Sequence, residues 1–265
     1  MVDTAKARPQ WRGVALPVEH GGWSFLVEPI LLGLLIAPSF TGLFLSIAAC
    51  AVFLIHQPLK VTMQDRRNGR VFKRTRLAER FTIAYGTVAL VSFILALVTT
   101  PHPFWIPLVF AVPFALIQLF YESQRKGREA TPEIAGALAL AITAPTIAVA
   151  SGWDVSTAMG LWIVLSLRSA TSILYVRSRL RLEKGKEANI ALPIGAHIVA
   201  LVIVLILASV NFLPFLTVVL MVILLARCAH GLSRYRKPVP VKIIGIQELI
   251  FGLITVVMTA LGYRI

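Results

Sequence analysis

The chain has 265 residues, of which 57% are apolar and 14% are charged, and its formal net charge is +14. Soluble globular proteins average about 25% charged residues, so this composition excludes an ordinary soluble domain. Together with a mean hydropathy of +0.81, it predicts an all-α integral membrane protein.

Apolar stretches of about 17–25 residues, each long enough to cross a bilayer as a helix, recur along the whole chain. Residues 1–17 form a short tail without an apolar stretch, so we expect the first span to act as its own insertion signal. We therefore expect a single polytopic domain over residues 1–265. The nine predicted transmembrane helices cover residues 18–37, 41–59, 81–99, 103–121, 134–151, 156–176, 189–209, 212–228 and 244–262.

The connections between the predicted spans alternate in charge. Nearly all Lys and Arg residues lie in the tail and in the connections 60–80, 122–133, 177–188 and 229–243, and the other connections hold none. This is the positive-inside pattern. It predicts a cell-membrane protein with a cytoplasmic N-terminus and an outside C-terminus. The basic charge is then a topology signal, and we expect no nucleic-acid partner.

The two most basic connections, 60–80 and 176–187, lie four helices apart. This spacing suggests two four-helix halves followed by a ninth helix, as internal duplication often produces in membrane proteins. Cys50 and Cys228 lie in or beside spans, and we expect both to be reduced rather than paired.

Glu28, Arg168 and Glu248 fall well inside predicted spans. A charge at a helix centre costs about 2.5–3.5 kcal/mol on insertion scales. The helical rise puts Glu28 and Arg168 roughly 13 Å, and Glu248 roughly 9 Å, from the nearest cytoplasmic-side charge. At such similar depths they could form a structural ion pair that fixes helix packing, or the floor of a cavity open to the cytoplasm. An intramembrane charge marks a functional site by default, which favours the cavity.

Polar residues end the second predicted span. Spacings of three and four put Gln57, Lys60 and Gln64 on one helical face, with His56 on it or close by. With one carboxylate, Asp65, this set is a poor metal site. Arginines in the two basic connections make an anion site credible, although each arginine singly could be a positive-inside anchor. The arginines considered for this site are Arg66, Arg67, Arg70, Arg177, Arg179 and Arg181.

The first predicted span opens with Glu19, His20 and Trp23. Glu19 is favourable in a first turn against the helix dipole. His20 is as consistent with a wetted interfacial position as with a ligand contact, and Trp23 could belong to a membrane-interface belt.

The stretch "PVEHGGWSFLVEPILLGLL", followed by "HQPLK" at the end of the second span, resembles the YwiC-like family of bacterial membrane proteins. That family in turn resembles, distantly, the UbiA superfamily of intramembrane prenyltransferases. The resemblance implies a UbiA-like bundle of nine helices, with its site on the cytoplasmic side under the connections after helices two and six. Glu19, His20, Trp23 and Glu28 would then line the cytoplasmic half of a central cavity.

The magnesium-diphosphate motifs of UbiA-type enzymes do not carry over to this chain. The first motif falls on His56, Gln57, Lys60 and Gln64, with Asp65 one residue off, and the second falls on Arg177 and Arg181. Because nearly every acid is replaced, we expect no magnesium, no other metal and no cofactor. Arg177 and Arg181 also face away from Arg168 if the sixth span is one straight helix.

These features predict a cavity that binds an isoprenoid or lipid-type ligand, whose polar or anionic head meets His20, His56 and the arginines. Whether the protein is an enzyme stays open. One alternative is a divergent membrane transferase in which Glu19 or His20 acts as a general acid or base. The others are a non-enzymatic transporter and a partner of a respiratory complex.

Overall fold

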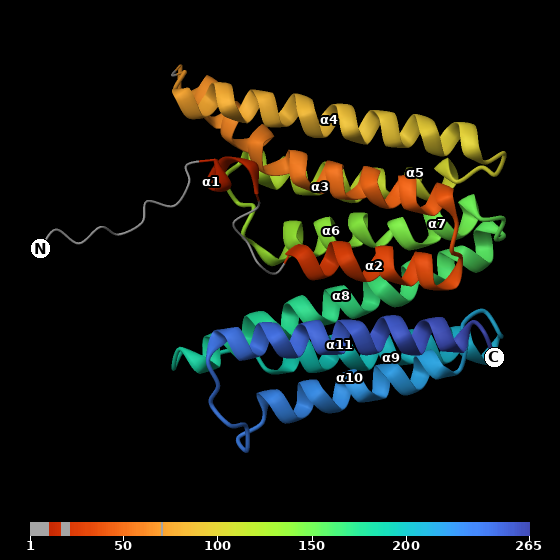
Figure 1. Ribbon diagram of the computed structural model, residues 1–265. Helices are drawn as coiled ribbons and strands as arrows, with labels where there is room; N and C mark the ends of the chain where they lie inside the picture. The colour runs from red at the N-terminus through yellow and green to blue at the C-terminus, as the bar shows by residue number, and fades with distance from the viewer. Residues whose placement is uncertain (1–10, 17–21, 70) are drawn as a thin grey trace, which may run out of the picture.

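The computed structural model describes residues 11–16, 22–69 and 71–265 (Figure 1). All regular secondary structure within these residues is α-helix. The helices are α1 (Arg12–Ala15), α2 (Gly22–Ile36), α3 (Phe40–Arg67), α4 (Lys73–Thr99), α5 (Trp105–Ser123), α6 (Ala130–Ala141), α7 (Thr143–Ala150), α8 (Val155–Glu183), α9 (Ala191–Ser209), α10 (Leu216–Leu232) and α11 (Val241–Gly262).

Seven helical stretches of the described chain are long and apolar enough to cross a membrane. Six of them are single helices: α3, α4, α5, α8, α9 and α11. The seventh is α6 and α7 taken together. The apolar helices α2 and α10 are shorter, with 15 and 17 residues. The prediction of an all-helical, multi-pass membrane protein is confirmed. The figure of nine spans stays a prediction.

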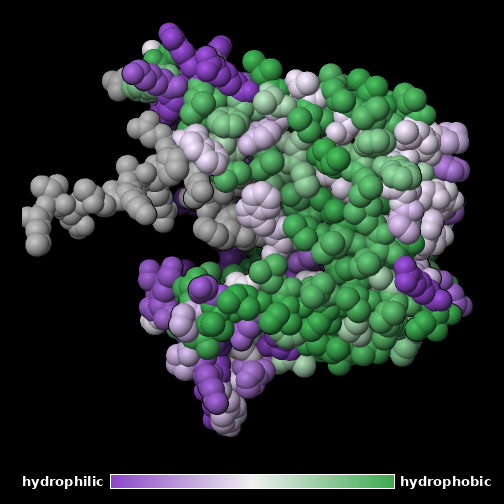
Figure 2. All heavy atoms as spheres, in the orientation of Figure 1, coloured by the Kyte–Doolittle hydropathy of each residue, from purple (hydrophilic) through white to green (hydrophobic). Residues whose placement is uncertain are grey.

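The helices run side by side and join at two ends of the bundle (Figure 1). The connections after α3, α5, α8 and α10 lie at one end, here called the basic end, where hydrophilic residues gather (Figure 2). The connections after α2, α4, α7 and α9 lie at the opposite end, as does the C-terminus (Figure 1). The face shown in Figure 2 is mostly apolar between the two ends, as expected for a face in contact with lipid.

Two helices continue past the predicted membrane boundary. The predicted second and sixth spans end at residues 59 and 176, but α3 runs to Arg67 and α8 to Glu183. Loss of hydrophobicity ends an apolar stretch without ending a helix, because Lys, Arg and Gln are good helix formers. Each helix stops just before a glycine in the left-handed region, Gly69 at φ 65° and Gly185 at φ 66°.

The predicted fifth span is broken into α6 and α7 at Ile142. Pro145 explains the break, because it has no N–H to donate to the carbonyl of Ala141 and its ring crowds that carbonyl. The Ile142 carbonyl accepts both the backbone N–H of Thr146 at 3.1 Å and its hydroxyl at 2.8 Å, so the helix resumes directly after the break.

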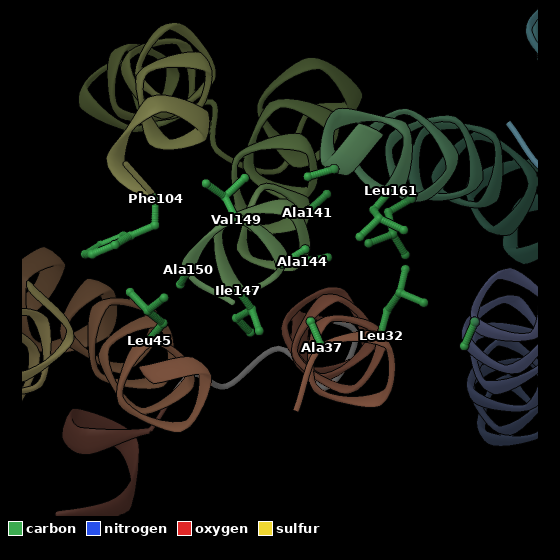
Figure 3. Close-up of a cluster of buried hydrophobic side chains, with 14 of the residues drawn as sticks. Leu32, Ala37, Leu45, Phe104, Ala141, Ala144, Ile147, Val149, Ala150 and Leu161 are labelled. Carbon is green, nitrogen blue, oxygen red and sulfur yellow. The ribbon is translucent and has the colours of Figure 1, made fainter. Parts of the chain in front are cut away.

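Helix α7 lies at the centre of the main apolar core, and every one of its residues is buried. Small residues let its neighbours approach closely: a Cβ added to Gly33 of α2 would lie 2.9 Å from Ile147 Cβ. Leu32 of α2, Leu45 of α3 and Leu161 of α8 close around α7, together with Phe104 just before α5 (Figure 3). Close packing of small residues is how helices associate in lipid. The core therefore ties α2, α3, α5 and α8 together around the site described next.

Candidate functional site

A cavity of about 590 Å³ opens at the basic end, between α2, α3, α5, α6 and α8. Helix α3 contributes His56, Gln57, Lys60 and Gln64. The spacing of these residues predicted a shared face, and the structure brings all four to one cavity. Trp23 does not line it, but its ring meets the ring of the lining residue Phe53 edge-on at 5.2 Å.

The opposite wall carries polar residues that the sequence analysis missed. Helix α5 contributes Gln118 and Glu122, and Arg128 and Glu133 come from the α5–α6 connection and α6. Gln118 lies inside the predicted fourth span, and Glu122 follows it at a helical spacing of four. Their spacing could have indicated a polar helical face. Glu122 was overlooked because it falls in the connection 122–133, which the positive-inside pattern places in the cytoplasm rather than in a span.

The charges of the cavity are paired with one another. Glu122 lies 2.6 Å from His56 Nε2 and 3.5 Å from Lys60 Nζ. Arg177 Nη1 lies 3.0 Å from the Glu133 carboxylate and donates to the Arg128 carbonyl at 3.1 Å. Each pair joins two helices across the cavity, so the polar wall is held in place without a ligand.

The cavity also has an apolar part. Phe25 of α2, Phe53 of α3, and Ala137 and Leu140 of α6 line it beside the polar residues. A cavity that is polar on one side and apolar on the other suits an amphipathic molecule.

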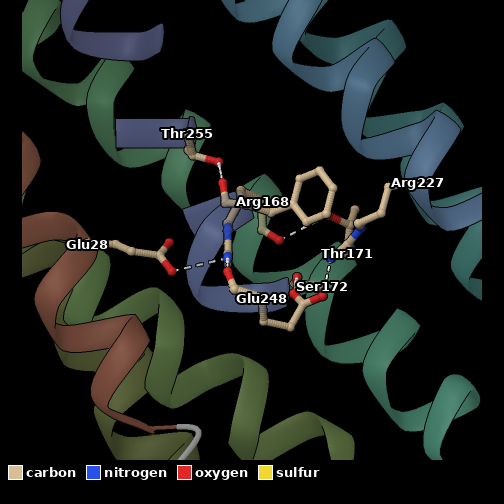
Figure 4. A network of polar contacts seen from close by, with 8 residues as sticks. Glu28, Arg168, Thr171, Ser172, Arg227, Glu248 and Thr255 are labelled. Carbon is tan, nitrogen blue, oxygen red and sulfur yellow. Dashed lines mark hydrogen bonds and ion pairs between the residues drawn. The ribbon is translucent and has the colours of Figure 1, made fainter. Parts of the chain in front are cut away.

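A second polar group, the buried ion network, lies between α2, α8, α10 and α11 (Figure 4). Arg168 Nη2 lies 3.1 Å from the Glu28 carboxylate and donates to the backbone carbonyl of Glu248 at 2.9 Å. The Glu248 carboxylate instead pairs with Arg227 and accepts from the Ser172 hydroxyl. Two cations and two carboxylates therefore balance in the bundle.

Arg227 was not identified from the sequence. It lies at the end of the predicted span 212–228, where a single arginine is expected to face the cytoplasm at the membrane boundary. In the structure its guanidinium stacks over the Tyr175 ring at 4.1 Å and over the Phe251 ring at 5.1 Å. Aromatic faces stabilise a cation that has left water, which explains how a fourth charge is tolerated there.

The network is tightly packed and not fully satisfied. A Cβ on Gly252 of α11 would lie 2.2 Å from Glu28 Oε1, so only glycine leaves room for this carboxylate. Both Glu28 oxygens, Arg168 Nε and two Arg227 nitrogens make no hydrogen bond. Buried groups of this kind make the charge pairs costly to break.

The structure does not bring the remaining candidates to the cavity. Asp65 binds Arg74 at 2.6 and 3.1 Å and Thr75 at 2.7 Å, and Arg66 binds Glu79 at 2.6 Å. Both contacts hold the end of α3 against α4. Glu19, His20 and Arg70 lie outside the described residues.

Arg181 does not line the cavity, and its Nε donates to the Glu187 carbonyl at 2.8 Å. Arg177 and Arg181 were expected to serve one site, but only Arg177 lines the cavity. Within the described ranges, no three His, Cys, Asp or Glu residues are grouped closely enough to hold a metal ion.

The description "YwiC-like protein" is that of a family model that matches residues 16–148, half of the chain. These residues include α2, α3 and most of the cavity wall. No curated protein and no solved structure matches the chain. The chain belongs to the YwiC-like protein family.

Proposed function

We propose that this YwiC-like protein spans the cell membrane nine times and holds the polar head of an isoprenoid or lipid-type ligand in its cavity. The observation that carries the proposal is the amphipathic cavity at the basic end. Its polar residues lie on helices that meet at the basic end, and Phe25, Phe53 and Leu140 supply an apolar part. An isoprenoid or acyl chain matches the apolar part, and a polar head matches Gln57, Gln64 and Gln118.

The alternation of the connections supports nine spans with the basic end in the cytoplasm. Helix α10 runs between the two ends of the bundle, and α2 finishes at the end opposite the basic end (Figure 1). Their 15 and 17 residues extend about 22 and 26 Å, against a hydrocarbon core of about 30 Å. Local thinning of the bilayer accommodates spans of that length.

The lengths of α3 and α8 support a UbiA-like division into two halves. In such a division, α2–α5 form the first half and α6–α10 the second, with α6 and α7 counted as one span. The second span is then α3 in the first half and α8 in the second, and these helices have 28 and 29 residues. Both continue beyond the membrane at the basic end, and both reach the cavity.

Magnesium fits this site poorly, because the two carboxylates that line it, Glu122 and Glu133, are paired with His56, Lys60 and Arg177. The family resemblance would place carboxylates where Gln57, Lys60 and Gln64 line the cavity. The nearest carboxylate on that helix, Asp65, is occupied by Arg74 and Thr75. An anionic head would instead meet Lys60 and Arg177 directly. Arg177 uses one nitrogen for its contacts to Arg128 and Glu133, which leaves donors for a ligand.

Glu19 and His20, which lie outside the described residues, bear on whether the ligand is only bound or is also transformed. His20 and Glu19 precede the lining residue Gly22 by two and three positions in the sequence. We keep them as the candidate acid–base pair of a divergent transferase. A binder or transporter needs neither.

Native mass spectrometry of gently extracted protein tests the proposal. We expect a retained isoprenoid or lipid-type molecule, and we expect Ala137→Leu, which fills the cavity, to lower its occupancy severalfold. The matched control is Ala84→Leu on the exposed face of α4, which should retain the wild-type occupancy. Equal retention in wild type and Ala137→Leu would refute the proposal.

A further inference from the structure

A second hollow, the α8–α9 groove, lies at the basic end outside the cavity. It has a volume of about 510 Å³ and is bounded by the end of α8, the α8–α9 connection, the first turn of α9 and the start of α6. Arg177 lines both hollows, whereas Arg181 lines the groove alone. The groove is therefore a separate place for a ligand.

Two arginines form the rim of the groove. Arg177 and Arg181 are four residues apart on α8, and so lie on one face of the helix. The bond from Arg181 Nε to the Glu187 carbonyl orients the guanidinium and leaves its two terminal nitrogens free to donate. Paired guanidinium groups of this kind match the oxygens of a phosphate.

The far wall is fixed by hydrogen bonds of the α8–α9 connection. The Ser178 hydroxyl donates to the Asn189 carbonyl at 2.9 Å, and the Asn189 side chain accepts from the Leu192 amide at 3.0 Å. The groove is thus formed before any ligand arrives, which lowers the entropic cost of binding.

The floor of the groove is apolar. Leu174 of α8 and Leu192 of α9 line it, and Leu192 is 55% exposed. Leu192 begins the apolar length of α9, so an apolar chain lying on it continues into the hydrocarbon region. Arginines above leucines at this level match a phospholipid, whose phosphate lies at the interface and whose acyl chains lie deeper.

We propose that the α8–α9 groove binds an anionic phospholipid with a hydroxylated headgroup, of the phosphatidylglycerol class. Arg177 and Arg181 bind the phosphate, and Leu174 and Leu192 contact the first acyl carbons. Glu187, the one carboxylate among the lining residues, accepts from the headgroup hydroxyls. This site goes beyond the proposed cavity ligand and shares only Arg177 with it.

The experiment counts lipids bound to the purified, delipidated protein by native mass spectrometry. The probes are phosphatidylglycerol, phosphatidylcholine with the same acyl chains, and inorganic phosphate. We expect phosphatidylglycerol to bind more tightly than phosphatidylcholine. Arg181→Gln should weaken phosphatidylglycerol about fivefold, the effect of one interfacial cation. Leu192→Ser should also weaken it.

Arg76→Gln is the matched control, because it removes an exposed arginine from the same end, away from the groove. It should leave phosphatidylglycerol binding unchanged. Lys60→Gln, which alters only the cavity, should also leave it unchanged, so failure of the groove and failure of the cavity are distinguishable. Three results would each overturn the groove proposal: equal binding of the two lipids, an Arg181→Gln affinity equal to that of Arg76→Gln, or inorganic phosphate binding as tightly as phosphatidylglycerol.

Discussion

Arg168 of α8 lies 3.1 Å from the carboxylate of Glu28 of α2, and the two side chains are only 1% and 7% exposed. Breaking a buried pair by removing one partner costs about 3–5 kcal/mol, because the other charge stays buried alone. Arg168→Ala should therefore lower the folded yield and melting temperature strongly. In a background that already carries Glu28→Gln, the further loss should be much smaller, as measured by fluorescence-detected size exclusion after heating. Strictly additive losses would refute the pairing.

Glu248 should couple to Arg227 rather than to Arg168. Its carboxylate pairs with Arg227, whereas Arg168 binds its backbone carbonyl, which any substitution keeps. In a double-mutant cycle of melting temperatures, Glu248→Gln with Arg227→Met should therefore show a larger interaction than Glu248→Gln with Arg168→Met. The reverse order would contradict the arrangement of the network.

Gly252→Ala should destabilise the protein by about 1–3 kcal/mol, the range for overpacking. The added Cβ would lie 2.2 Å from Glu28 Oε1 and 3.1 Å from Arg168 Nη2. Gly245→Ala on the same helix is the control, because nothing lies within 4 Å of its added Cβ. It should keep or raise the melting temperature, since alanine favours a helix. Similar behaviour of the two variants would mean that Gly252 is not a close contact.

The sequence predicted those features that depend on one helix at a time. The spacing of His56, Gln57, Lys60 and Gln64 follows from helical geometry, and these four residues do share a cavity. The depth of Glu28 and Arg168 follows from the helical rise, and these two residues do meet.

Features that depend on contacts between helices were not predictable in this way. Glu122 was identified as a site residue only through its contact with His56 of α3, and Arg227 only through its contact with Glu248 of α11. Asp65 was placed beside the cavity by its position in a motif, but Arg74 and Thr75 of α4 bind it away from the cavity. Hydropathy carries no information about which polar groups pair.

The membrane topology gives a prediction that includes the two shortest spans. If α2 and α10 cross the membrane, reporters before and after each of them lie on opposite sides. Fusions at the basic end should report the cytoplasm, after Lys73, Arg128, Lys184 and Lys237. Fusions at the opposite end should report the outside, after Ser39, His102, Asp154 and Asn211. A cytoplasmic signal after Ser39 would remove α2 from the spans, and an outside signal after both Asn211 and Lys237 would remove α10.

The last prediction separates this site from a magnesium-dependent prenyltransferase. The cavity offers Lys60 and Arg177 where magnesium would need carboxylates, and cations there repel a metal ion but bind a phosphate directly. A prenyl diphosphate should therefore raise the melting temperature of the purified protein equally with magnesium and with EDTA. Arg177→Ala should weaken this binding about tenfold, the contribution of one charge-assisted hydrogen bond. Arg181→Ala should leave it unchanged, because Arg181 lies outside the cavity.

Asp65→Asn is the decisive control in the same titration. Because its carboxylate binds Arg74 and Thr75, its loss should lower the melting temperature of the free protein by loosening α3 from α4. The shift that the prenyl diphosphate adds should stay the same. If the ligand stabilises the protein only with magnesium, and Asp65→Asn abolishes that stabilisation, then Asp65 leaves Arg74 to hold the metal. In that case direct binding of the head by cations is wrong.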